Sequence, residues 1–148
     1  MARYLTSIEP KATADDAFDL IADFSRITAW DPGVVSGKRL DDGPIAVGSR
    51  FEVLSAVGPR RIPLTYEVLE WDRPHRAVLQ ARTRDFTSYD VITVADLAGS
   101  GSEVTYEANL NLHGVRRLAD PLLRVALQII GRRAESGIRR ALKDQVRS

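Results

Sequence analysis

Hydrophobic and polar residues alternate over residues 2–9, and this two-residue period predicts a strand that Pro10 ends. Over residues 14–22 the apolar residues recur every three or four positions, which predicts a short amphipathic helix. The residue before this helix, Thr13, is followed three residues later by an aspartate, a spacing that resembles a capping box with Asp in place of Glu. A second short helical turn is predicted over residues 24–29.

The middle of the chain consists of apolar runs separated by turn residues. Glycine, proline and aspartate interrupt the pattern at Asp41–Pro44, Gly58-Pro59, Asp72–Pro74 and Gly99–Gly101. Such short connections force neighbouring strands to be antiparallel, because a parallel pair needs a crossover of about a dozen residues. The pattern therefore predicts six strands in a meander, namely Val34–Leu40, Arg50–Val57, Arg61–Trp71, Arg76–Arg84, Thr87–Leu97 and Glu103–Leu112.

The C-terminal segment carries the pattern of a long amphipathic helix. The dipeptide Asp120-Pro121 is a favourable helix start, and residues 121–146 would form a rod of about 39 Å at ~1.5 Å per residue. The alternative is a continuous helix from Val115 that is kinked at the proline. The apolar stripe shrinks to glycine and alanine between residues 131 and 137. Small residues there either let the backbone approach a neighbour closely or leave space for a ligand.

The alternation is clearest in the last predicted strand, where the even positions from Val104 to Leu112 are apolar and the odd ones are polar. One face of this strand is expected to be buried and the other to be wet. In the preceding strand Ile92 is expected to point inward, and the same register carries Ser88 and Asp90 inward too. The pattern therefore predicts two polar side chains among apolar neighbours.

Composition narrows the class of protein without naming a function. The chain has 148 residues, 44% of them hydrophobic and 28% charged, which predicts a single globular domain over residues 1–148. It has no cysteine and only two histidines, so a thiolate site and a histidine metal site are both disfavoured. No leader-like or membrane-length apolar run occurs, and we expect a cytoplasmic protein that uses no metal or other cofactor.

Charge is distributed unevenly along the chain. Residues 115–148 hold nine Arg or Lys against three acidic residues, a net charge of +6, whereas the remaining residues carry a net charge of −5. The simplest interpretation is a solvated face on a terminal helix packed over an acidic body. The alternative is peripheral membrane contact through the basic helix. Nucleic acid is not expected as a partner, because the strands lack an aromatic base-stacking platform and the body is acidic.

The predicted order is one strand, two short helices, six strands and one long helix. With it, the sequence resembles the polyketide cyclase/dehydrase-like branch of the START and birch-pollen-allergen superfamily. The segments that carry the likeness are Ala17–Phe24, Trp30–Gly33, Val47–Phe51, Tyr66–Val68 with Pro74, and Leu110–Gly114. The resemblance implies an α+β helix-grip fold, in which a curved, antiparallel, seven-stranded sheet wraps around the long C-terminal helix. It also implies a cavity between them that holds a hydrophobic or amphipathic molecule.

The expected function is therefore that of a carrier or sensor for a hydrophobic small molecule or lipid, in a monomer or homodimer. We expect a cavity of ~300–1,000 Å³, unless the protein's own side chains plug it. The residues expected to contact the ligand are Trp30, Phe51, Tyr66, Ser88, Asp90, Ile92, Tyr106, Leu123, Leu127 and Ile130. Trp30 either closes one end of this cavity or packs in the core.

Further interpretations remain open from the sequence. A buried Asp90 beside Tyr106 would suit acid–base chemistry on an enolisable carbonyl, as a polyketide aromatase/cyclase or dehydratase requires. The structural alternative pairs Asp90 with Arg82 or Arg84 of the same sheet, because a buried carboxylate is rarely unpaired. A third functional class is an interaction module that holds a partner peptide in the same grip.

Overall fold

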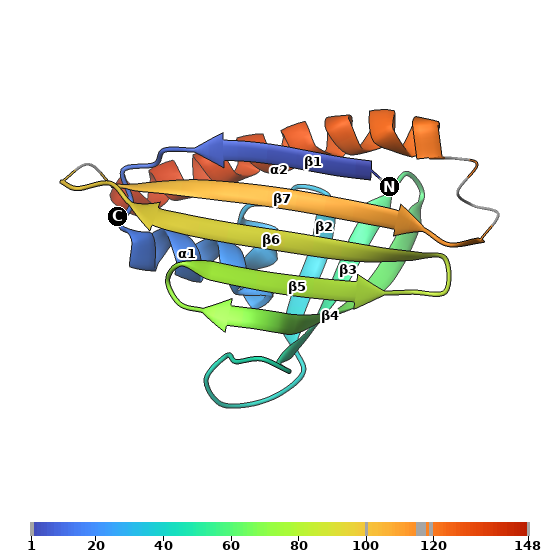
Figure 1. Ribbon diagram of the computed structural model, residues 1–148, viewed down its shortest axis with the longest axis horizontal. Coiled ribbons are helices and arrows are strands. Elements are labelled where there is room, and N and C mark those ends of the chain that lie inside the picture. Colours follow the sequence, from blue (N-terminus) through green and yellow to red (C-terminus); the bar gives the residue numbers. More distant parts are fainter. Residues whose placement is uncertain (1, 100, 115–117, 119, 148) are drawn as a thin grey trace.

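The chain folds as one antiparallel sheet with two α-helices on one of its faces, shown in the computed structural model of Figure 1. The structure describes residues 2–99, 101–114, 118 and 120–147, with the side chains of residues 57, 120, 122, 123 and 144–147 outside the description. The strands are β1 (Ala2–Ile8), β2 (Val34–Arg39), β3 (Arg50–Val57), β4 (Arg60–Asp72), β5 (Arg76–Arg82), β6 (Phe86–Asp96) and β7 (Ser102–Leu112). The helices are α1 (Ala14–Ala22), the 3₁₀ helix η1 (Phe24–Ala29) and α2 (Asp120–Arg147).

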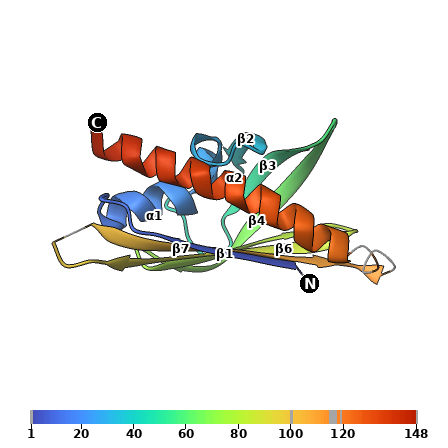
Figure 2. The ribbon, with the colours of Figure 1, turned by 90° about the horizontal axis from the view of Figure 1, so that it is seen from above.

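The sheet confirms the predicted meander. Its strand order is β1-β7-β6-β5-β4-β3-β2, and every neighbouring pair is antiparallel. The first strand joins the sheet beside the last, so β1 pairs with β7, with Ile8 opposite Val104. Figure 2 shows that β2, β3 and β4 curl up beside α2 while β1, β7 and β6 pass beneath it. The predicted helix-grip architecture is therefore present.

The predicted strand bounds agree with the structure to within two residues. The largest difference is at β5, which ends at Arg82 although the pattern predicted a strand to residue 84. The cause is a turn held by Thr83, whose Oγ1 accepts hydrogen bonds from the backbone N–H groups of Asp85 (3.2 Å) and Phe86 (3.1 Å). A short hydroxyl side chain that binds its own backbone in this way competes with the ladder and ends the strand.

The helix α1 forms as its capping residues predict. The Thr13 hydroxyl accepts a hydrogen bond from the backbone N–H of Asp16 at 3.1 Å, and the acidic first turn suits the positive end of the helix dipole. Its apolar face, centred on Ala17, Phe18 and Ile21, is fully buried. The 3₁₀ helix η1 follows directly and places Trp30 and the loop after it against α2.

The long helix α2 begins at Asp120. The alternative start at residue 115 lies outside the described residues. Side chains from β1 hold the middle of α2, because the Tyr4 hydroxyl donates to Glu135 Oε2 at 2.9 Å and the Thr6 hydroxyl donates to Glu135 Oε1. Throughout the described part of the chain, each helix falls short of the length and apolar character needed to cross a membrane.

Candidate functional site

A cavity of about 230 Å³ lies between the first half of α2 and the inner face of the curled sheet. It is smaller than the sequence predicted, because several of the large side chains expected around it pack instead into the core. Its walls come from β2, β3, β4, β6, β7, α2 and the loop before β2. They are Asp31, Gly33, Val34, Ser55, Ala56, Ile62, Leu64, Tyr66, Phe86, Ser88, Ala108, Leu110, Leu127, Ile130 and Arg133.

The small residues of α2 do not create this space. Gly131 lies against the ring of Tyr4, and Gly137 lies against the backbone carbonyl of Trp30, so a Cβ at either position would overlap its neighbour. Of the two sequence interpretations, close backbone approach is therefore the right one. The cavity lies instead beside the residues one turn earlier, Leu127 and Ile130, where α2 stands away from the curled strands.

Two hydroxyl groups face each other on the wall of the cavity. The side-chain oxygens of Tyr66 and Ser88 lie 3.4 Å apart, and both residues line the space. Burial raises the pKa of Tyr66 above its ordinary value, and the nearby Asp90 carboxyl raises it further. The Tyr66 phenol therefore stays protonated at neutral pH and is available to donate a hydrogen bond to a bound molecule.

Asp31 supplies a carboxyl group at the same cavity. Its Oδ1 accepts a hydrogen bond from the backbone N–H of Gly33 at 2.9 Å, which fixes the loop before β2. Burial raises the pKa of Asp31, and this hydrogen bond partly opposes the effect. Nothing in the sequence pattern had singled out Asp31 except its place in the Trp30–Gly33 segment.

Asp90 is buried behind this wall, where the Tyr106 hydroxyl donates to its Oδ2 at 3.0 Å. Burial raises the pKa of Asp90 to about 7; hydrogen bonds from Tyr106 and Ser88 oppose this effect, and the Asp31 charge adds to it. The predicted ion pair with arginine is wrong. Arg82 lies on the opposite face of the sheet and Arg84 in an exposed turn. The side chains described include no cation paired with Asp90.

Three of the expected ligand contacts lie in the core instead of on the cavity surface. Phe51 and Ile92 are fully buried, and Trp30 is 1% exposed. The Trp30 and Tyr106 rings form a T-shaped pair with their centroids 5.6 Å apart. The indole Nε1 of Trp30 is buried without a hydrogen-bond partner among the described atoms. Trp30 therefore packs in the core, the second of its two predicted roles. Contact between these three side chains and a ligand stays a prediction.

The structure brings together four of the expected residues at the cavity, namely Tyr66, Ser88, Leu127 and Ile130. The side chain of Leu123 lies outside the described residues. Sequence reasoning missed Leu64, Phe86 and Leu110, although each shares strand parity with a residue that it did select. It also missed Arg133, which belongs to the helix turn after Ile130.

The described residues contain no group of His, Asp and Glu side chains arranged to hold a metal ion. The chemistry that the cavity wall offers is therefore that of hydroxyl, carboxyl and guanidinium groups around an apolar space.

Comparisons with known proteins agree with this architecture. A family model described as polyketide cyclase/dehydrase and lipid transport matches residues 1–144. Comparison with the curated proteins finds no match. Among solved structures, the protein TTHA0849 from Thermus thermophilus has a TM-score of 0.74 and 16% identity over 95% of both chains.

Two further solved structures have the same fold. The di-domain ARO/CYC BexL from the BE-7585A biosynthetic pathway has a TM-score of 0.76 and 14% identity over 97% of this chain and 47% of its own. A START superfamily protein from Mycobacterium smegmatis has a TM-score of 0.73 and 11% identity over 99% of this chain and 98% of its own. At these identities the likeness shows the fold alone.

Proposed function

Because the chain belongs to the polyketide cyclase/dehydrase and lipid transport family, we propose that it binds a hydrophobic small molecule or lipid in the cavity between the sheet and α2. The family match and the START-like fold support a role in ligand binding or cyclisation. The observation that favours binding is the cavity itself, whose wall is apolar except at a few placed polar groups. That is the usual composition of a small-molecule site.

The size of the cavity limits what can enter it. A water-sized group occupies about 30 Å³. The cavity volume of about 230 Å³ therefore accommodates roughly eight such groups. A chain or ring of about eight carbon atoms therefore fills it. The aliphatic side chains of Ile62, Leu64 and Leu110 would contact this part, and the Tyr66 and Ser88 hydroxyls would meet a polar atom on it.

Filling the cavity from its wall tests this proposal. Ala108 lies on β7 and lines the cavity, so the larger side chain of Ala108→Leu would occupy space that a ligand needs. We expect this variant to bind 1-octanol at least about tenfold more weakly than the wild type, a loss of ~1.4 kcal/mol. Titrations of the ¹⁵N-labelled proteins followed by NMR measure both affinities.

The matched control is Ala95→Leu, which makes the same change at an exposed position of β6. It should bind 1-octanol as the wild type does. Equal affinity for 1-octanol in the wild type and in Ala108→Leu would mean that the cavity is not the binding site.

A polyketide aromatase/cyclase or dehydratase is the second candidate. The Asp90–Tyr106 hydrogen bond favours it, because a carboxyl with a pKa of about 7 can exchange a proton near neutral pH. Ser88 hydrogen-bonds Asp90 and lines the cavity together with Tyr66, so Asp90 would act through these hydroxyls as a positioning residue. Recovery of a bound β-hydroxy ketone unchanged supports the carrier, and its conversion to the α,β-unsaturated ketone with release of water supports the enzyme.

A further inference from the structure

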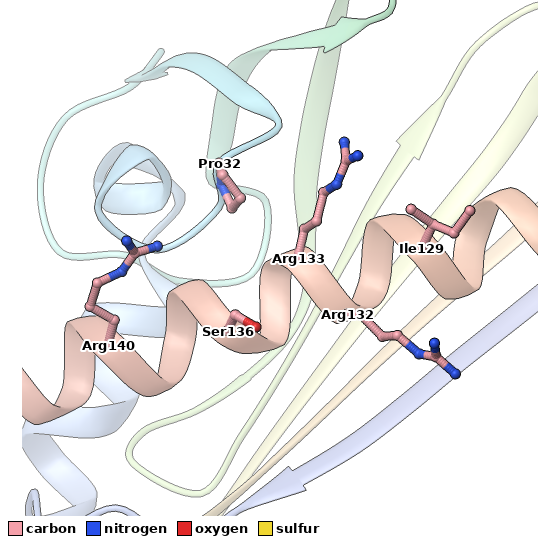
Figure 3. A pocket seen from close by; sticks show the side chains of 6 residues that line it. All are labelled: Pro32, Ile129, Arg132, Arg133, Ser136 and Arg140. Atoms are coloured by element: carbon pink, nitrogen blue, oxygen red, sulfur yellow. The ribbon is translucent and has the colours of Figure 1, made fainter.

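A second hollow lies on α2 beside the cavity, and Figure 3 shows it from close by. It is an open groove of about 480 Å³, here called the arginine groove. Its lining residues are Pro32, Ile129, Arg132, Arg133, Ser136 and Arg140. Of the three arginines that line it, only Arg133 also lines the cavity.

Two of the arginines point the same way. Arg133 and Arg140 are seven residues apart, which is two helical turns, so both lie on one side of α2 with Ser136 between them. In Figure 3 their guanidinium groups flank Pro32, whereas Arg132 extends to the other side of the helix. The groove therefore presents two guanidinium groups on either side of a serine hydroxyl.

Neither Arg133 nor Arg140 has an acidic partner among the residues that the structure describes. Their neighbour Arg139 differs, since its guanidinium binds Glu135 Oε1 at 3.1 Å. A guanidinium group carries donors in a fork that matches a carboxylate or a phosphate. Two unpaired forks around one groove therefore favour an anion there.

The arginine groove and the cavity share a wall. Arg133 lines both, and Ile129 of the groove is followed along α2 by Ile130 of the cavity. The loop before β2 joins them in the same way, because Pro32 lines the groove while Asp31 and Gly33 line the cavity. The two spaces therefore adjoin at Arg133, the side chain that a molecule would pass in order to extend from the cavity into the groove.

We propose that the cavity and the arginine groove form one site for an amphipathic anion. A tail of about eight carbon atoms occupies the cavity, and a carboxylate or phosphate head lies between Arg133 and Arg140. This proposal rests on the proposed function and adds the chemical class of the ligand to it. The orientation follows from Asp31, whose carboxyl lines the cavity and disfavours a second acidic group inside it.

Three probes with the same eight-carbon chain, namely 1-octanol, octanoate and octyl phosphate, distinguish the contribution of the head group to the affinity from that of the tail. We expect the wild type to bind octyl phosphate or octanoate at least about tenfold more tightly than 1-octanol, as measured by NMR titration. Arg133→Gln and Arg140→Gln should each remove most of this preference. Arg140→Gln should also leave the affinity for 1-octanol unchanged, because Arg140 lines the groove and is not part of the cavity wall. Comparison of the two anions tells which head the groove prefers.

The matched control is Arg139→Gln, which removes the same charge from the same helix but from a side chain paired with Glu135. It should keep the preference for octyl phosphate. Loss of the preference in Arg139→Gln to the same extent as in Arg133→Gln would mean that net charge alone attracts the anion, which would overturn the proposal.

Other outcomes overturn it in distinguishable ways. If 1-octanol and both anions bind equally to the wild type, the head site is refuted while the proposed function stands. If none of the three probes binds, both the head site and the proposed function are refuted. If inorganic phosphate alone binds as tightly as octyl phosphate, the groove is a separate anion site with no link to the cavity.

A membrane surface is the remaining source of anionic heads. Sedimentation with phosphatidylcholine vesicles, with and without phosphatidylglycerol, tests it. If Arg133→Gln and Arg140→Gln lose binding to the anionic vesicles but keep the wild-type preference for monomeric octyl phosphate, the arginines serve a membrane surface and the proposal is wrong. If they lose the preference for octyl phosphate below its micelle-forming concentration, the proposal is supported.

Discussion

The carboxyl group of Asp90 lies in a part of the molecule that does not favour its charge. It is 4% exposed, its hydrogen-bond partners are the hydroxyl groups of Tyr106 and Ser88, and the charge that acts on it comes from a second carboxyl, that of Asp31. Removing a carboxylate from water without a cation costs several kcal/mol, so the proton is held instead. Asp90 is thus a residue whose protonation state, and with it the hydrogen bonding at the cavity wall, changes near neutral pH.

This makes the stability of the fold depend on pH through Asp90. Its pKa is about 7 in the folded protein and 3.8 for an unperturbed aspartate side chain. The folded state therefore holds the proton more tightly, and the stability contributed by Asp90 is fully present below about pH 4 and is lost as the pH rises to about 7. The difference between the two pKa values corresponds to roughly 4 kcal/mol.

We expect Asp90→Asn to gain stability relative to the wild type by about this amount between pH 4 and pH 8. The amide is neutral throughout, and its carbonyl oxygen can still accept the hydrogen bond from Tyr106. Urea unfolding of both proteins at a series of pH values measures the difference, from which the contributions of all other groups cancel. Asp96→Asn, at an exposed position of the same strand, should show no such trend. A difference that does not change with pH would mean that Asp90 has the same pKa in the folded and unfolded states.

At the scale of single residues, sequence reasoning predicted which way side chains point, but it left open which side chains they contact. Parity along β6 placed Ser88 and Asp90 on the inner face, where both are buried. Of the two partners considered for Asp90, an arginine was wrong, because Arg82 occupies the outer face, and Tyr106 was right, because its hydroxyl reaches Asp90 from β7. A cross-strand partner depends on register between strands, which the period within one strand does not contain.

The helix α2 approaches its neighbours most closely through its glycines. Gly131 meets a side chain, the ring of Tyr4, whereas Gly137 meets backbone, the carbonyl of Trp30. A side chain can shift to accept an added methyl group, but the Trp30 carbonyl belongs to a loop fixed between η1 and the Asp31–Gly33 turn. Gly137 is therefore the less replaceable of the two.

We expect Gly137→Ala to destabilise the protein by about 1–3 kcal/mol, because overpacking against fixed backbone forces α2 or the loop to move. The intrinsic helix preference of alanine acts in the opposite direction, by roughly 1 kcal/mol. Ser136→Ala, at the exposed neighbouring position, should change stability by less than about 0.5 kcal/mol. Thermal unfolding of both variants measures these effects. A Gly137→Ala variant that is more stable than the wild type would mean that the close contact is absent in solution.

At the scale of elements, the sequence predicted every strand and helix but not how the long helix is used. Its apolar stripe indicated one buried side, and Ala134 and Ile138 of that stripe are buried, as is the neighbouring Leu142. The same stripe could not tell a tight contact from an empty space, because glycine suits both. Only the surfaces that oppose Gly131 and Gly137 decide this, and these come from residues more than 100 positions away along the chain.

Across the whole molecule, the two halves of α2 are packed differently. The second half is packed into the main core through Ile138 and Leu142, which are fully buried. In the first half only Leu127 is buried among the described side chains, and Val125, Ile129 and Ile130 are 47–62% exposed. Figure 2 shows the first half lying over the inner face near β7 and the curled strands, where the cavity is.

The antiparallel meander explains why the overall fold was predictable while the cavity was not. Short turns left neighbouring strands one way to pair, and the single long helix had one exposed sheet face to cover. The volume of the cavity is instead a small difference between the curl of the sheet and the bulk of the side chains inside it. Trp30, Phe51 and Ile92 fill space that the sequence had assigned to a ligand.

The uneven packing of α2 predicts uneven local stability. Few buried contacts hold residues 124–131, so we expect their backbone amides to exchange with deuterium faster than those of residues 134–142, in which opening exposes the main core. A ligand that binds the cavity contacts Leu127 and Ile130, and should slow exchange in residues 124–131 while leaving the second half nearly unchanged. Hydrogen-exchange mass spectrometry with and without 1-octanol measures both segments. The Ala108→Leu variant supplies the control. Its two halves of α2 should still exchange at different rates, but because its cavity is filled, 1-octanol should not change the exchange of either half. Uniform exchange along α2, or equal protection of both halves by 1-octanol, would mean that the helix moves as one unit and that the ligand does not enter beneath its first half.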